Sequence, residues 1–119
     1  MRIELPEESV LLRIFISGQD RYHHQPLYEA LVLKAREVGL AGATVLRGPL
    51  GYGHTSRLHT AKILRLSDDL PLVVEIVETQ QKIDAFLPVL DEMMESGLVT
   101  IEKARVLRYG PNPKKQPTT

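Results

Sequence analysis

The feature that most constrains the fold is the order in which two kinds of apolar pattern follow one another. The first kind is a short stretch rich in β-branched and large apolar residues, typical of strands. The second has apolar residues at helical spacing and covers 26–38 and 79–97. The order matches the ferredoxin-like βαββαβ fold, with one additional strand between the helices. We therefore predict an α+β protein with an antiparallel sheet and two helices on one face. The predicted strands are 10–17, 43–47, 61–66, 72–77 and 98–109.

Local signals support these boundaries. Pro26 suits the first turn of a helix, where a backbone N–H is not needed, and Gly39 fits its end. Thr79 can cap the second helix, which Gly97 is expected to end. In the last strand the alternation of apolar residues breaks near Glu102 and Lys103, which predicts a bulge or a change of partner strand.

Composition narrows the classes of protein. The chain has 119 residues, the size of one domain, and 43% of them are hydrophobic, so it can bury a core. It has no cysteine, and its 15 basic residues balance 15 acidic ones, which argues against a nucleic-acid binder. No apolar run is long enough to span a bilayer, and the first nine residues lack the order of a signal peptide. We therefore expect a cytoplasmic protein without nucleic-acid binding or direct membrane insertion.

We predict one domain over residues 10–110. Residues 1–9 form a lead-in, and residues 111–119 hold three prolines and two lysines without a large apolar residue. A segment of that composition cannot bury enough apolar surface to order itself, so we predict a disordered tail.

The predicted sheet has apolar residues on both faces. In the first strand Leu12 and Ile14 point to one side, and Leu11 and Phe15 to the other. Because both helices cover one face, the second face is left for another molecule, which predicts a homo-oligomer. The alternative is a twisted sheet with scattered exposed apolar residues.

The segment 48–56 contains three glycines and one proline and is predicted to be a loop. It has roughly the spacing of a phosphate-binding P-loop, but His54 replaces the lysine and a strand follows where a helix is required, so we reject that motif. The glycines still allow backbone N–H groups to approach an anion. The alternative is a mobile loop whose conformation reflects turn chemistry alone.

Arginine and tyrosine side chains are the candidate ligand contacts. Arginine offers a planar fork that suits phosphate oxygens, and tyrosine can stack on a base. Surface arginines paired with carboxylates are the alternative. The four histidines do not form a pattern that predicts three or four converging metal ligands, and no nucleophile–base pair is recognisable. We therefore predict neither a metal site nor an enzyme. The candidates are Arg47, Arg57, Arg105, Arg108, Tyr52 and Tyr109.

Several motifs together resemble the PII-like family catalogued as domain of unknown function 190, which is related to the nitrogen regulatory PII proteins. The resemblance covers nearly the whole chain from the first strand to Tyr109. The motifs are LRIFI (12–16), PLYEA (26–30), TVLRG (44–48), GYG (51–53), SRLHTA (56–61), LSDDLP (66–71) and GLVTIE (97–102).

The resemblance implies a trimer in which nucleotides bind between subunits, at the base of a long loop that reaches a partner protein. The matching loop here is Gly48 to His59, which is shorter than in PII proteins. PII proteins also have a glycine-rich phosphate-binding turn after the second helix, where this chain has only Glu95-Ser96-Gly97-Leu98. We therefore expect AMP or ADP in preference to ATP.

The predicted function is that of a homotrimeric, PII-like regulatory protein that binds a small anion, an adenine nucleotide, and requires no cofactor. One alternative is an interaction module without nucleotide, whose loop 48–59 docks on a membrane transporter or an enzyme. A less favoured alternative is a small ferredoxin-like enzyme. The predicted ligand-binding residues are Arg47, Gly48, Gly51, Tyr52, Gly53, Arg57, Arg105 and Arg108.

Overall fold

A computed structural model of the chain describes residues 5–54, 58–60, 70–112 and 114–115. Its elements are β1 (Glu8–Ser17), β2 (Arg21–Tyr22), β3 (Gln25–Pro26), α1 (Leu27–Glu37), β4 (Thr44–Arg47), β5 (Leu50–Gly51), β6 (His59–Thr60), β7 (Pro71–Glu78), α2 (Gln80–Met93) and β8 (Leu98–Arg105).

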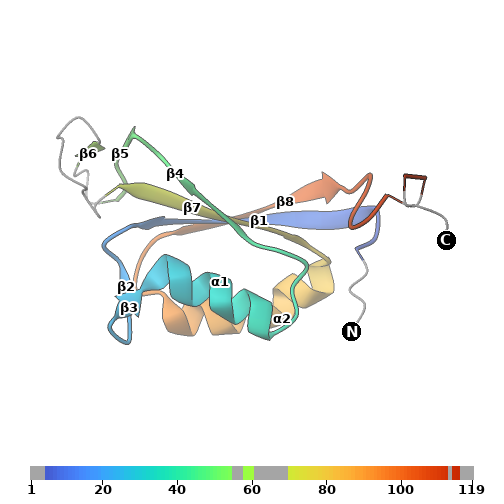
Figure 1. Ribbon diagram of the computed structural model, residues 1–119. Helices are drawn as coiled ribbons and strands as arrows, with labels where there is room; N and C mark the ends of the chain where they lie inside the picture. The colour runs from blue at the N-terminus through green and yellow to red at the C-terminus, as the bar shows by residue number, and fades with distance from the viewer. Residues whose placement is uncertain (1–4, 55–57, 61–69, 113, 116–119) are drawn as a thin grey trace.

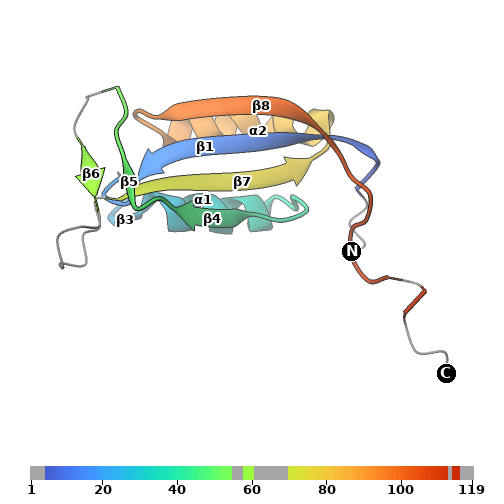
Figure 2. The ribbon, with the colours of Figure 1, turned by 90° about the horizontal axis from the view of Figure 1, so that it is seen from above.

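The main sheet has four strands in the order β4-β7-β1-β8, and all neighbours are antiparallel. Both helices lie against one face of this sheet (Figure 1), and the view from above, turned by 90°, shows the four strands in front of the helices (Figure 2). This is the predicted α+β ferredoxin-like arrangement. The stretch predicted as a buried central strand is β7, between β4 and β1. The predicted strand 61–66 lies outside the described residues.

The predicted bulge in the last strand is wrong. Strand β8 pairs with β1 residue by residue from Glu8–Arg105 to Phe15–Leu98, and Leu11 stands opposite Glu102 in unbroken register. The alternation breaks for a different reason. Strand β8 is at the edge of the sheet, and all of its residues except Ala104 are exposed, Val99 and Ile101 to 38% and 40%. Charged side chains can therefore lie on either face of β8 without burial.

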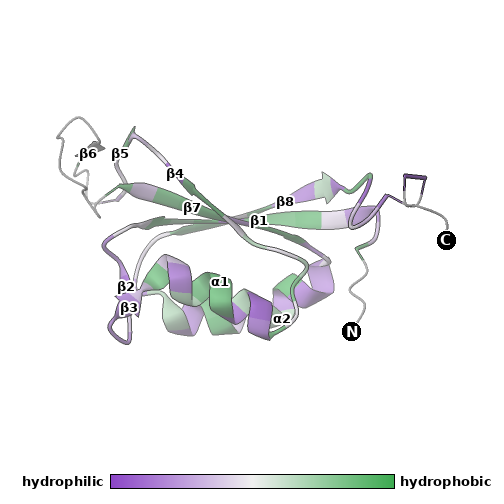
Figure 3. Cartoon of the chain, in the orientation of Figure 1, coloured by the Kyte–Doolittle hydropathy of each residue, from purple (hydrophilic) through white to green (hydrophobic). Residues whose placement is uncertain are grey.

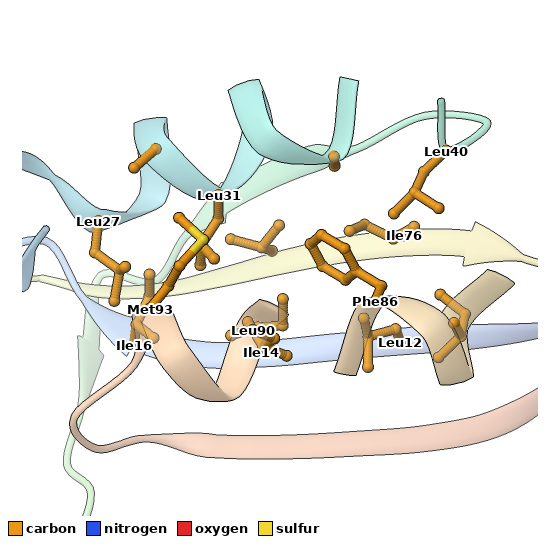
Figure 4. Close-up of a cluster of buried hydrophobic side chains, with 14 of the residues drawn as sticks. Leu12, Ile14, Ile16, Leu27, Leu31, Leu40, Ile76, Phe86, Leu90 and Met93 are labelled. Carbon is orange, nitrogen blue, oxygen red and sulfur yellow. The ribbon is translucent and has the colours of Figure 1, made fainter. Parts of the chain in front are cut away.

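The hydrophobic core lies between the two helices and the central strands (Figure 4). Figure 3 shows these strands as mostly hydrophobic, whereas both helices alternate between hydrophobic and hydrophilic residues. Burying one large aliphatic side chain contributes roughly 1.5–3 kcal/mol, so this layer is the main source of the fold's stability. Its central members are Leu12, Ile14, Leu31, Leu72, Val74, Ile76, Ile83 and Phe86.

Local capping fixes the helix ends. Gly39 has φ of +82°, and the N–H of Leu40 donates to the carbonyl of Ala35 at 3.0 Å, which is a Schellman motif and confirms Gly39 as the end of α1. The Thr79 side chain accepts the N–H of Lys82 at 3.2 Å, as predicted. Helix α2 ends at Met93, four residues before Gly97. Gly97 is instead required by packing, because a Cβ there would lie 2.8 Å from the carbonyl oxygen of Phe15.

One corner of the fold is held by a buried carboxylate. Glu78 is completely buried, and its two oxygens accept the N–H groups of Ala41 (2.8 Å) and Thr79 (2.7 Å). The hydroxyl of Tyr109 donates to the carbonyl of the same Ala41 at 2.6 Å. The connection from α1 to β4 is therefore joined both to the start of α2 and to the segment that follows β8.

Candidate functional site

The predicted loop leaves the sheet at the end of β4, directly after Arg47. The N–H of Gly48 donates to the carbonyl of Pro71 at 2.8 Å. A Cβ on Gly48 would lie 3.0 Å from Cγ of Pro71, and one on Gly51 would lie 3.2 Å from the same atom. Both glycines thus allow the base of the loop to pack on the Pro71 ring, and the amide of Gly48 is already bonded within the chain.

A two-residue ladder closes the loop above this base. Leu50 pairs with Thr60 and Gly51 with His59, which forms β5 and β6. Tyr52 is 71% exposed, and Gly53 has open space around its Cα. The tyrosine face is therefore accessible to a ligand or a partner. Arg57 lies outside the described residues.

The predicted arginines fall at opposite corners of the sheet. Arg47 is opposite Leu72, the second residue of β7, beside the loop, whereas Arg105 is opposite Glu8, the first residue of β1, at the other end of the sheet. Strands β4 and β8 are also the two edges of the sheet, and Figure 1 shows the loop and the end of β8 at opposite ends of the molecule. One chain therefore does not bring Arg47 together with Arg105 or with Arg108, which follows it.

These arginines also differ in whether an acidic side chain of the same chain pairs with them. Arg105 donates through Nε to Glu7 at 2.5 Å. Within the described part of the chain, Arg47 and Arg108 have no acidic partner, and Arg47 is exposed. Arg47 is thus available to an anion at the base of the loop.

The face of the sheet turned away from the helices, here called the open face, carries an apolar row across all four strands. Leu46, Val73, Phe15 and Leu98 stand opposite one another in register. Leu46 and Leu98 are exposed. This row confirms that the sheet has apolar residues on both faces, as the sequence indicated.

An ionic group that was not predicted from the sequence lies beside that row. Arg13 of β1 donates through Nε to Glu75 of β7 at 2.9 Å and through Nη1 to Glu102 of β8. The hydrogen bond with Glu75, and the charge of Glu102, raise the pKa of Arg13 above its ordinary value. The available signal was one charged residue inside each of two apolar stretches, Arg13 in β1 and Glu75 in β7, but the partners are far apart in sequence.

A hollow of about 300 Å³ lies on the helix side. The hollow is lined by Tyr22, Gln25, Ala30, Leu33, Lys34, Glu37, Val89, Glu92 and Met93. None of the predicted ligand-binding residues that the structure describes lines this hollow.

His23 and His24 form the turn between β2 and β3, both with positive φ, and the ring centroids of His23 and Tyr22 stack 4.1 Å apart. In the described ranges no three histidine or acidic side chains are placed to hold a metal ion.

Neither helix among the described residues is long and apolar enough to cross a membrane.

Solved structures with the same arrangement of elements are PII-like proteins. CPII, a nitrogen regulatory PII-like protein from Thiomonas intermedia K12 bound to ADP, AMP and bicarbonate, superimposes with a TM-score of 0.58 at 16% identity, covering 85% of this chain and 90% of CPII. The B. subtilis GlnK–ATP complex gives 0.54 at 11% identity, covering 84% of each chain. The fold is therefore PII-like.

Residues 9–106 match the family described as DUF190, uncharacterized ACR. A UPF0166 protein of Aquifex aeolicus is 40% identical over 97 residues, which cover 82% of this chain and 91% of the relative. A UPF0166 protein of Methanocaldococcus jannaschii is 30% identical over 99 residues, covering 82% and 91%. The chain belongs to the DUF190 family, as its motifs indicated.

Proposed function

We propose that this chain is a cytoplasmic, homotrimeric regulatory protein that binds an adenine nucleotide between subunits, at the base of loop 48–59, and catalyses no reaction. The observation that carries the proposal is the separation of its arginines. Arg47 is exposed beside the loop, whereas Arg105 and Arg108 lie at the opposite corner. A phosphate site that uses both groups requires a second copy of the chain.

The open face supports assembly. Its apolar row, Leu46–Val73–Phe15–Leu98, crosses the whole sheet, and an apolar surface of this kind is typical of an interface. Closed cyclic assemblies dominate among homo-oligomers. The PII-like neighbour CPII, which binds ADP and AMP, is consistent with an adenine nucleotide as the ligand.

The experiment is calorimetric titration with AMP, ADP and ATP of the wild-type protein and the Arg47→Ala variant. A charge-assisted hydrogen bond contributes about 1.5–3 kcal/mol, so the variant is expected to bind AMP or ADP at least about tenfold more weakly. Light scattering should show an unchanged trimer. Arg36→Ala is the matched control, because Arg36 is an exposed arginine at the end of α1.

Equal affinity of Arg47→Ala and wild type would place the ligand elsewhere than the loop base. Absence of binding by any of the three nucleotides at millimolar concentration would favour the second candidate, an interaction module that docks its loop on a transporter or an enzyme. Exposed apolar residues in this segment, Leu50, Tyr52 and Leu58, favour that candidate.

A further inference from the structure

The ionic group on the open face lies in the middle of its apolar surface. Arg13 stands on a central strand, with Glu75 and Thr100 as its cross-strand neighbours. The row through Phe15 lies on one side of it, and Leu11 with Val77, which are paired, lie on the other. An association that covers the apolar residues on both sides must therefore also cover Arg13.

Arg13 has hydrogen-bonding capacity that its own chain does not use. A guanidinium carries five N–H donors, and two nitrogens of Arg13 make contacts, Nε with Glu75 and Nη1 with Glu102. In the part of the chain that the structure describes, the remaining donors meet no acceptor. Arg13 is 37% exposed, so water satisfies them in a single chain. A buried guanidinium needs acceptors in place of that water.

Glu102 is the acidic residue best placed to reach a second chain. Its side chain is 57% exposed, whereas that of Glu75 is 29% exposed. Glu75 stands between Thr44 and Arg13 in the interior of the sheet. Glu102 lies on the edge strand β8, and one of its oxygens, Oε1, contacts Arg13. The other oxygen can accept from a neighbouring molecule.

We infer that Arg13 of one copy and Glu102 of the next form an intersubunit ion pair that sets the register of the assembled chains. The inference rests on the proposed homotrimer, and the partner is a second copy of this chain. Apolar residues alone permit many sliding arrangements, whereas a covered charge that must meet its counterpart permits few. Arg13 is thus a specificity residue of the interface.

The test compares the trimer dissociation constants of wild type, Arg13→Gln, Glu102→Gln and the double variant by sedimentation. Truncating one partner of a covered, hydrogen-bonded charge pair is strongly disruptive, so Arg13→Gln should weaken assembly at least about tenfold. Glu102→Gln should weaken it less, because the amide keeps an acceptor. The double variant should be weakened by less than the product of the two single effects. Glu92→Gln, an exposed residue of α2, is the matched control.

Folding of each variant is checked by urea unfolding, where an exposed ion pair within one chain contributes little. A wild-type trimer that all three variants reproduce would overturn the ion pair and leave the proposed assembly intact. A wild-type monomer at micromolar concentration would overturn the proposed trimer itself. To detect contact between chains directly, Arg13→Cys and Glu102→Cys proteins are mixed and treated with a short bis-maleimide, which is selective because the chain has no cysteine. Cross-linking no greater than in a mixture of Arg36→Cys and Glu102→Cys would also overturn the inference.

Discussion

The two faces of the sheet use the same strands in different ways. On the covered face, Leu12 and Ile14 of β1 are completely buried under the helices. On the open face, Arg13 and Phe15 of the same strand remain partly exposed. Alternate residues of one strand therefore serve two purposes, since one set stabilises the single chain and the other is available for association.

Substitution of Phe86 by alanine should give the largest effect and separate the two faces most clearly. Phe86 is among the largest fully buried side chains, and removal of such a ring costs about 3–5 kcal/mol. Urea unfolding should show this loss, whereas Phe15→Ala on the open face should cost the isolated chain much less. Equal losses for the two alanine variants would contradict the contrast between the faces.

Substitution of Glu78 by glutamine tests the charged residue on the covered face. The carboxylate accepts N–H groups from Ala41 and Thr79, and an amide would turn an NH₂ group toward one of them. An unsatisfied buried donor costs about 1–3 kcal/mol, so we expect that loss in the free energy of unfolding. Glu29→Gln, at an exposed position in the first turn of α1, is the control, and identical stabilities would refute the role of Glu78.

The smallest effect on folding is expected for Leu46→Thr on the open face. Leu46 is exposed on the edge strand β4, and surface substitutions usually change stability by less than about 0.5 kcal/mol. Unfolding measured at low protein concentration should therefore match wild type, while light scattering should show weaker association. A loss of several kcal/mol in the dilute chain would mean that the open face belongs to the core.

Much of the fold could be predicted because its signals are local. The β-branched and large apolar residues of β1 and β7 indicate strands within each segment itself, and Gly39 and Thr79 act within their own helix ends. The bulge near Glu102 was predicted incorrectly because exposure in β8 depends on the strand's position at the edge of the sheet. That position is set by pairing with β1, more than 80 residues earlier.

The candidate site was less predictable for the same reason. The sequence offered Arg47, Arg105 and Arg108 as candidate ligand contacts, but their placement at opposite corners depends on the strand order, which no motif contains. The contacts of Arg13 join residues 62 and 89 positions apart. The sequence contains glycines at 48 and 51, but only the three-dimensional structure shows that both pack on Pro71.

The central position of β1 has a consequence for synthesis of the protein. Both of its partners, β7 and β8, come late in the chain, so a nascent chain carries β1 without neighbours until most of the domain has emerged from the ribosome. Long-range strand pairing of this kind folds slowly and leaves strands open to aggregation. The residues around position 13, Leu11-Leu12 and Ile14-Phe15-Ile16, would form one uninterrupted apolar segment without the arginine. A charge at that point is the type of gatekeeper that keeps an unpaired strand from joining others, so we expect Arg13 also to limit aggregation of the chain before it has folded.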